Sequence, residues 1–305
     1  MKKATPYRIL AAIVLLQVIC VPAALAVTSI VKPVFYVPTD KSYYFYDFHN
    51  VQCGLRNVQR WYSRELPNDN VAFDNLLLYY GNYTSQQCID NMGQCIEDTK
   101  NGTGIDPWDS DDTRNKLLII GRGFLGWAGG TGDNQGRGYA VAGAESLVAQ
   151  GECAGNWWCT EEYWNGTVIH ELGHAFSLPH NSDPDSIMNS HGDYKNKHLT
   201  GSHPAIVESD PATRTKDPNW TRCENDYQCA TLRCGCNGGD TMYCLPHSGY
   251  PKWCSYRSIP NWEFCRWDWE CASYYCDPDW RGWLACLPHT GYVYCWIDLF
   301  LPEYP

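Results

Sequence analysis

The chain has 305 residues and a formal net charge of −11, from 23 basic and 34 acidic side chains. A hydrophobic content of 44% excludes a wholly disordered protein, and the acidity argues against binding to the phosphate backbone of nucleic acids. The 17 cysteines are typical of an oxidising compartment and argue against a cytosolic enzyme. The length fits one to three domains.

Residues 1–26 have the pattern of a secretory signal peptide. A basic head precedes an apolar run over 9–21, and Ala24-Leu25-Ala26 has the small residues of a cleavage site. An uncleaved membrane anchor is the alternative, because the run from 9 to 26 approaches the length of a membrane span. Pro22 favours cleavage after Ala26, and no second apolar run of spanning length follows. We therefore expect a secreted, extracellular product with no stable membrane span.

Four Asn-x-Thr triplets fit a secretory route, because they accept N-linked glycans in hosts that glycosylate asparagine. They begin at Asn82, Asn101, Asn165 and Asn219. We therefore expect a glycoprotein.

The first domain, predicted over residues 27–217, alternates strand and helix patterns. Residues 34–37 form a short β-rich run, and residues 51–66 have the apolar spacing of an amphipathic helix that Pro67 ends. Further strands are predicted at 71–80, 117–120 and 139–142. This order, with later helices, predicts an α+β fold in which helices pack on a mixed sheet.

A glycine-rich run from Gly121 to Gly138 connects the last two predicted strands. It lacks the Gly-Lys-Ser/Thr ending of a phosphate-binding loop. We expect a tight loop that lies along an edge strand. The strand at 139–142 beside it is a candidate to pair with an extended peptide, and a purely structural strand is the alternative.

Cysteine usage changes sharply near residue 217. Residues 27–217 hold five cysteines and residues 218–305 hold eleven, in two copies, about 223–254 and 265–295, whose spacing and flanking residues match. We expect disulfides to staple this small duplicated module, because neither copy is large enough for its own core. Zinc binding by the tail is the alternative, disfavoured because the tail has no Cys-x-x-Cys pair. The stretch 208–218, with two prolines and mixed polar residues, has the composition of a boundary between the first domain and the tail.

The odd number of cysteines on each side of this boundary predicts a disulfide between the two parts, provided that every cysteine pairs. If Cys88–Cys95 and Cys153–Cys159 form local disulfide loops, Cys53 has no partner within the first domain. In the tail, Cys236 has no counterpart in the second repeat. A Cys53–Cys236 bridge follows if both local loops form. A free Cys53 is the alternative.

The strongest chemical signal lies between Thr167 and His180. His170 and His174 are four residues apart, so on a helix both imidazoles project from one face and can bind one Zn2+. Glu171 is placed to reach a metal-bound water without binding the metal. Pro179 favours a turn that presents His180 as a third ligand and leaves the fourth position to water. A buried helix with merely hydrogen-bonded histidines is the alternative.

This segment resembles the long zinc signature of the metzincin metalloproteases. Met188 lies eight residues after His180, a spacing similar to that of the Met-turn in matrixins, where a methionine lies beneath the metal. The resemblance implies a zincin-like mixed sheet with an active-site helix, one catalytic Zn2+ and a protein or peptide substrate. It also implies that Glu171 is the catalytic base.

Ser177 departs from the family pattern, which has glycine at this position to end the helix in a left-handed turn. A serine in that conformation costs on the order of 1 kcal/mol. His191 and Tyr194 follow Met188 closely and are candidates to line the site, with ordinary surface positions as the alternative.

The sequence therefore predicts a secreted zinc-dependent endopeptidase, in which a zinc-activated water attacks the peptide bond and Glu171 transfers the proton. The alternative is a secreted disulfide-rich binding protein with an inactive protease-like domain. In that case tryptophans of the tail, such as Trp262, Trp267 and Trp280, would bind a glycan or protein ligand. The complete set of histidines and Glu171 disfavours an inactive relic.

Overall fold

The computed structural model describes residues 29–43, 45–109, 115–124, 128–144 and 160–218, and short pieces of the tail between 222 and 286. The predicted signal peptide, Cys153–Cys159, Asn219 and most of the duplicated module lie outside the described residues. Within the described part, no helix combines the length and the apolar character needed to cross a membrane.

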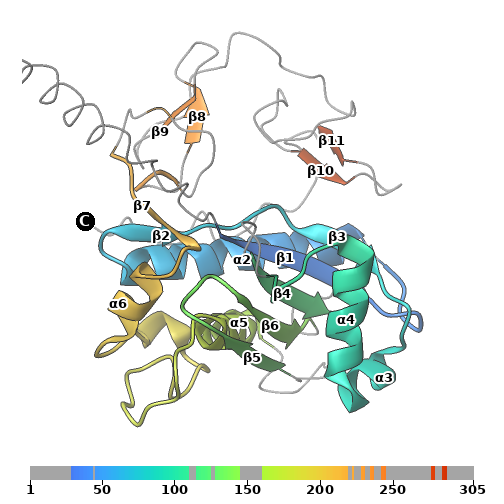
Figure 1. Cartoon of the computed structure of the whole chain (residues 1–305). Coiled ribbons are helices and arrows are strands. Elements are labelled where there is room, and N and C mark those ends of the chain that lie inside the picture. Colours follow the sequence, from blue (N-terminus) through green and yellow to red (C-terminus); the bar gives the residue numbers. More distant parts are fainter. Residues whose placement is uncertain are drawn as a thin grey trace, which may run out of the picture.

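A five-stranded mixed sheet forms the centre of the first domain (Figure 1). Its strand order is β3 (Leu77–Tyr80), β1 (Ile30–Val37), β4 (Asn115–Gly121), β6 (Gly138–Gly143) and β5 (Ala128–Gly132). The first four strands are parallel, and β5 runs antiparallel to β6. The apolar side chains of β1 and β4 are almost all buried, as expected for strands covered on both faces.

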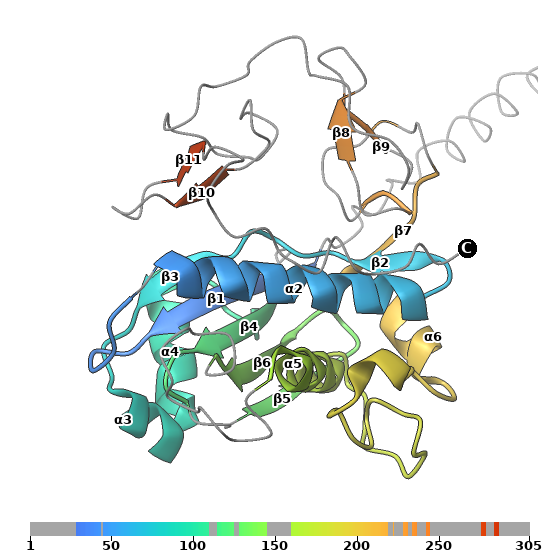
Figure 2. The same ribbon diagram turned by 180° about the vertical axis from the view of Figure 1, so that it is seen from behind.

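Helices cover both faces of this sheet (Figures 1 and 2). On one face, α2 (Phe45–Glu65) and α5 (Glu161–Ala175) pack on side chains such as Leu118 and Ile120. On the other, α3 (Ser85–Asp90) and α4 (Met92–Thr103) pack on side chains such as Leu117 and Ile119. Successive residues of β4 thus alternate between two cores. The predicted α+β class is confirmed.

A small two-stranded ribbon follows the segment that carries the three histidines. After the turn η1 (Tyr194–Asn196) and α6 (His203–Glu208), β7 (Thr213–Thr215) pairs with β2 (Asp69–Val71). The stretch 208–218 is therefore packed against the domain. The side-chain amide of Asn70 donates a hydrogen bond of 2.8 Å to the carbonyl of Cys229, which brings the first piece of the tail onto this ribbon.

Two short hairpins are described in the tail. One consists of β8 (Cys234–Cys236) and β9 (Met242–Cys244), the other of β10 (Cys276–Pro278) and β11 (Leu284–Cys286). Cys234 pairs in register with Cys244, and Cys276 with Cys286. These are corresponding positions of the two predicted repeats.

Three predicted elements differ from the structure by several residues. The strand predicted at 34–37 begins at Ile30. The helix predicted at 51–66 begins at Phe45 and ends at Glu65. The buried Asp47 places negative charge in its first turn, where it is favourable, and forms an ion pair with Arg122. The strand predicted at 71–80 is two strands in different sheets. Between them, the Asp74 carboxylate forms an ion pair with Lys32 while its backbone N–H donates to the carbonyl of Val31, so the chain cannot run straight.

The interpretation of the glycine-rich run as a loop is wrong in part, because residues 128–132 form strand β5. As a result β6 lies between β4 and β5 and is no edge strand. The glycines are explained by α5, whose backbone lies directly against β5. A Cβ atom at Gly130 would lie 2.3 Å from the carbonyl oxygen of Glu171, and one at Gly132 only 2.0 Å from that of Ala175.

The described disulfides match part of the prediction. The Cys88–Cys95 loop is confirmed, and Cys229–Cys244 closes a loop within the first repeat. Cys53 is disulfide-bonded, so a free Cys53 thiol is wrong. The Cys53–Cys236 bridge stays a prediction.

The predicted glycan acceptors differ in exposure. Asn82 and Asn101 are exposed, but the Asn165 side chain is only 1% exposed, within α5. Its amide donates to the Tyr194 hydroxyl at 3.4 Å. The fold therefore leaves no room for a glycan at Asn165.

We predict that Gly130→Ala destabilises the protein by about 1–3 kcal/mol, because the new methyl group must displace either the backbone of α5 or that of β5. Urea unfolding of the variant measures this loss. Gly192→Ala is the control, since a Cβ atom there meets nothing closer than 3.9 Å. Equal stabilities for the two variants would contradict the close packing of α5 on β5.

Candidate metal centre

Helix α5 begins where its sequence favours a helix start. The side chain of Thr160 accepts a hydrogen bond from the backbone N–H of Tyr163, and Glu161 and Glu162 place negative charge in the first turn. The Tyr62 hydroxyl of α2 donates to the carbonyl of Ile169 at 2.8 Å. The helix is thus held at its start and in its middle, next to the histidines.

The structure brings His170, His174 and His180 together. Their Nε2 atoms lie 3.1 Å (His170–His180), 3.2 Å (His170–His174) and 3.0 Å (His174–His180) apart. All three lie in the one group of the described residues that could hold a metal ion. The group runs from buried His170 through half-buried His174 to exposed His180, so the site opens toward solvent on the His180 side.

Hydrogen bonds on the far side of two rings fix where their protons lie. Nδ1 of His170 faces the carbonyl oxygen of Ile187, and Nδ1 of His174 faces that of Leu178, each at 2.8 Å. Since a carbonyl oxygen only accepts, both Nδ1 atoms carry the proton, and both Nε2 atoms present lone pairs. Two lone pairs 3.2 Å apart cannot hydrogen-bond to each other, so the arrangement suits a cation better than a hydrogen-bonded histidine cluster.

The turn after α5 has the predicted left-handed conformation, with Ser177 at a φ of 64°. The backbone N–H of Ser177 donates to the carbonyl of His174, and that of Leu178 to the carbonyl of Gly173, the two bonds of a Schellman cap. The Ser177 hydroxyl also donates to the carbonyl of Gly132 on β5 at 2.8 Å. This bond offsets part of the cost of a serine at this position.

Met188 packs directly against helix α5. It is fully buried, and a Cβ atom at Gly173 would lie 2.6 Å from its sulfur. Because Gly173 has no side chain, the methionine can pack against the backbone of α5 at this position. The preceding residue, Ile187, supplies the carbonyl that orients His170.

Burial gives the site its electrostatic character. Desolvation lowers the pKa of His170 to about 4 and also lowers that of His174, so both rings are neutral at pH 7, as metal binding requires. The Glu171 side chain is buried, with the residue 8% exposed, and desolvation raises its pKa to about 7. A carboxyl group with this pKa can both accept and donate a proton near neutral pH.

The two candidates after Met188 have different surroundings. The His191 ring lies 5.1 Å from the His170 ring and 5.0 Å from the Tyr163 ring, so it borders the site. Tyr194 is 7% exposed, and its carbonyl accepts the indole N–H of Trp61 at 2.9 Å. Tyr194 therefore connects α2, α5 and the following turn and does not line the site.

Sequence reasoning missed Lys116, whose ammonium contacts the last turn of α5. It directly precedes the apolar run 117–120, and a charged residue inside a buried strand is the only signal that could have drawn attention to it. No spacing rule connects it to its partners.

No protein-family model matches the sequence, and no curated protein matches it. Similar solved structures include OgpA from Akkermansia muciniphila (17% identity, 61% of this chain and 62% of that chain, TM-score 0.40). Others are archaemetzincin from Methanopyrus kandleri (14%, 59% and 94%, 0.33) and a zinc-dependent peptidase from Methanocorpusculum labreanum (14%, 58% and 99%, 0.29). The chain matches less than two thirds of the length of OgpA.

Substitutions at Ser177 separate backbone strain from the hydroxyl contact. Ser177→Ala keeps the strain and loses the bond to Gly132, so we expect a loss of about 1 kcal/mol in unfolding free energy. Ser177→Gly loses the same bond but relieves a strain of similar size, so its stability should stay within about 0.5 kcal/mol of wild type. Chemical denaturation measures both. An alanine variant as stable as the glycine variant would contradict this account.

Glu171→Gln should stabilise the metal-free protein at high pH. Because the pKa of Glu171 is raised in the folded state, folding stability falls as pH rises from about 4.5 to about 7, and the loss persists above pH 7. The variant lacks this loss, so at pH 8 it should exceed wild type by about 2–3 kcal/mol, with no difference at pH 4. Urea unfolding with chelator present measures both. Glu162→Gln, on the same helix with its side chain 42% exposed, is the control. A pH-independent difference would contradict burial as the cause.

Proposed function

We propose that the protein is a secreted zinc-dependent endopeptidase that hydrolyses peptide bonds in protein or peptide substrates. One observation carries the proposal: the Nε2 atoms of His170, His174 and His180 converge within 3.2 Å. The residue that follows His170 along α5, Glu171, is buried. Two of these atoms present lone pairs that face each other, which a bound cation would stabilise.

In this proposal His170, His174 and His180 hold the metal, and the exposed side near His180 leaves a position for water and substrate. When bound, zinc supplies a Lewis acid that lowers the pKa of water and polarises a carbonyl group. Glu171 accepts the proton of the attacking water and returns it to the leaving amine. The carbonyls of Ile187 and Leu178 keep two imidazoles in the tautomer that binds metal.

Strand β5 is the candidate partner for an extended substrate. It is the last strand in the sheet order, and a Cβ atom at Gly130 would lie 3.2 Å from the Cβ of His174. A peptide added beside β5 would therefore run next to the histidines, with main-chain hydrogen bonds to the strand. Residues 139–142, which the sequence favours for this role, lie in β6. Strands β4 and β5 pair with β6 on its two sides, so no peptide can be added there.

The disulfides Cys88–Cys95 and Cys229–Cys244 support the proposed secretion, because such bonds persist in oxidising compartments. The competing function, a binding protein with an inactive protease-like domain, places the activity in the tail. The complete group of three histidines and a buried glutamate favours the enzyme.

The decisive test is casein cleavage by the purified mature protein and by Glu171→Gln, with zinc content measured for both. We expect about one zinc per chain in each, and a loss of about 100–10,000-fold in kcat/KM for the variant, since a general base contributes this much. Glu162→Gln controls for the loss of a carboxylate from α5.

A chelator should abolish cleavage, and added zinc should restore it. Full activity of Glu171→Gln would contradict the assigned base. A zinc-loaded wild-type protein that cleaves no casein, gelatin or peptide library would favour the binding protein.

A further inference from the structure

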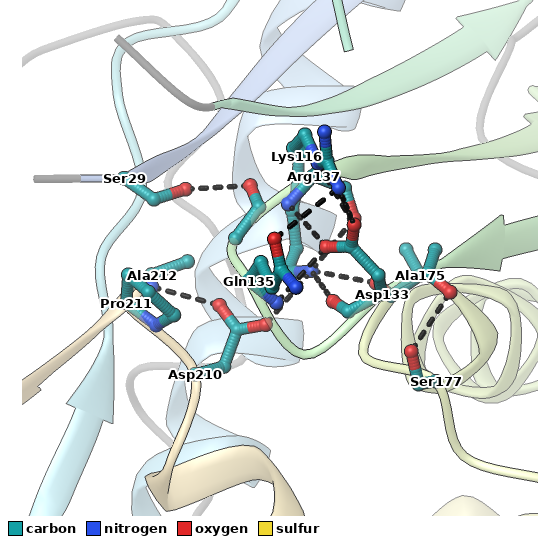
Figure 3. Close-up of polar contacts among 12 residues, drawn as sticks. Ser29, Lys116, Asp133, Gln135, Arg137, Ala175, Ser177, Asp210, Pro211 and Ala212 are labelled. Atoms are coloured by element: carbon teal, nitrogen blue, oxygen red, sulfur yellow. Dashed lines mark hydrogen bonds and ion pairs between the residues drawn. The ribbon is translucent and has the colours of Figure 1, made fainter. Parts of the chain in front are cut away.

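Lys116 places a buried positive charge at the end of the metal-binding helix (Figure 3). Its side chain comes from β4, is fully buried, and forms an ion pair of 3.0 Å with the equally buried Asp210. Its ammonium also donates a hydrogen bond of 2.6 Å to the carbonyl of Ala175, in the last turn of α5. A lysine is almost never fully buried unless it is paired, so this position has a structural cause.

Two glycines clear the path from β4 to the helix. Lys116 is in register with Gly138 on β6, which is in register with Gly132 on β5. Cβ atoms at Gly138 and Gly132 would lie 3.0 Å and 2.0 Å from the carbonyl oxygen of Ala175. The side chain of Lys116 can therefore extend past these two glycines to the carbonyl of Ala175. A residue with a side chain at either glycine position would displace that carbonyl.

The ammonium group of Lys116 contacts several elements at once. It donates to the carbonyls of Asp133 and Arg137, both at 3.2 Å, where β5 and β6 are connected. It also lies 4.8 Å from the centre of the Phe176 ring, the residue that follows α5. A cation at this end is favourable because the last carbonyls of a helix carry partial negative charge.

Asp210 extends the same contact to the C-terminal segment of the domain. It follows α6, and its carboxylate accepts a hydrogen bond from the backbone N–H of Ala212 at 2.8 Å. The neighbouring Pro211 accepts the backbone N–H of Ser29 at 3.3 Å, just before β1. The ion pair thus joins the helix end to two distant parts of the chain (Figure 3).

The end of α5 leads directly to the metal site. Two residues after Ala175, Ser177 binds Gly132 on β5, and then Leu178 presents the carbonyl that orients His174. His180 follows within two residues. A displacement of Ala175 would therefore shift the group that fixes one histidine and the turn that carries another.

We propose that Lys116 is a positioning residue of the metal centre: its ammonium, neutralised by Asp210, fixes the end of α5 against the β5–β6 hairpin and so sets the placement of His174 and His180. This inference rests on the proposed zinc site. Lys116 itself contacts neither metal nor substrate in this role.

The test is a zinc titration of wild type, Lys116→Met and the double variant Lys116→Met/Asp210→Leu. Removing the lysine alone leaves Asp210 buried and unpaired, so that variant is expected to unfold more easily. The double variant replaces the pair with apolar groups, which commonly restores stability. We expect its melting temperature to approach that of wild type while its zinc dissociation constant stays about 10–100-fold weaker, the effect typical of losing a group that orients metal ligands.

A second readout is the visible absorption of the Co2+-loaded proteins, which reports the geometry of the ligands. It should change in the double variant. The control is Arg122→Met/Asp47→Leu, which removes a buried ion pair of 2.8 Å between the end of β4 and the first turn of α2. This control should bind zinc and Co2+ as wild type does.

The outcomes separate the two hypotheses. A double variant that is folded and binds zinc and Co2+ like wild type would overturn the positioning role. The same loss of zinc affinity in the Arg122→Met/Asp47→Leu control would also overturn it, because the effect would then follow from general destabilisation. If wild type itself binds no zinc, the proposed function fails and the inference fails with it.

Discussion

The direct contact between the backbone of α5 and the strand β5 is the constraint on which the rest of the site depends. At Gly130 and Gly132 there is no room for even a methyl group, because carbonyl oxygens of the helix occupy that space. The strand must therefore be rich in glycine. This approach also lets Ser177 hydrogen-bond to the strand and lets Lys116 reach the helix end from β4, so one close contact places both the edge strand and helix α5.

The cluster of three histidines could be predicted from the sequence because its determinants are local. The spacing of His170 and His174 places both rings on one face of a helix, and the proline before His180 favours the turn that brings the third ring back. The left-handed residue at Ser177 is implied by the resemblance to the metzincins, and the structure has it at a φ of 64°. The short Cys88–Cys95 loop also depends on a short stretch of chain.

The remaining features depend on contacts between distant parts of the chain. Nothing near Lys116 indicates that Asp210 will neutralise it, since the two residues meet only after β4 and the segment behind α6 have packed. The division of residues 71–80 between two sheets depends on the contacts of Asp74 with Lys32 and Val31 and on the pairing of β2 with β7, all far away along the chain. The glycine content favours a loop at 128–132, and only the packing of α5 shows why a glycine-rich strand forms there.

The central claim is that the three histidines hold one zinc ion, and zinc X-ray absorption of the purified protein tests it most directly. The account predicts one zinc per chain with imidazole nitrogen neighbours at about 2.0–2.1 Å and one further light ligand. His180→Ala should remove one of these nitrogens. Zinc bound by sulfur at about 2.3 Å would instead place the metal on the cysteines of the tail, and would contradict the account.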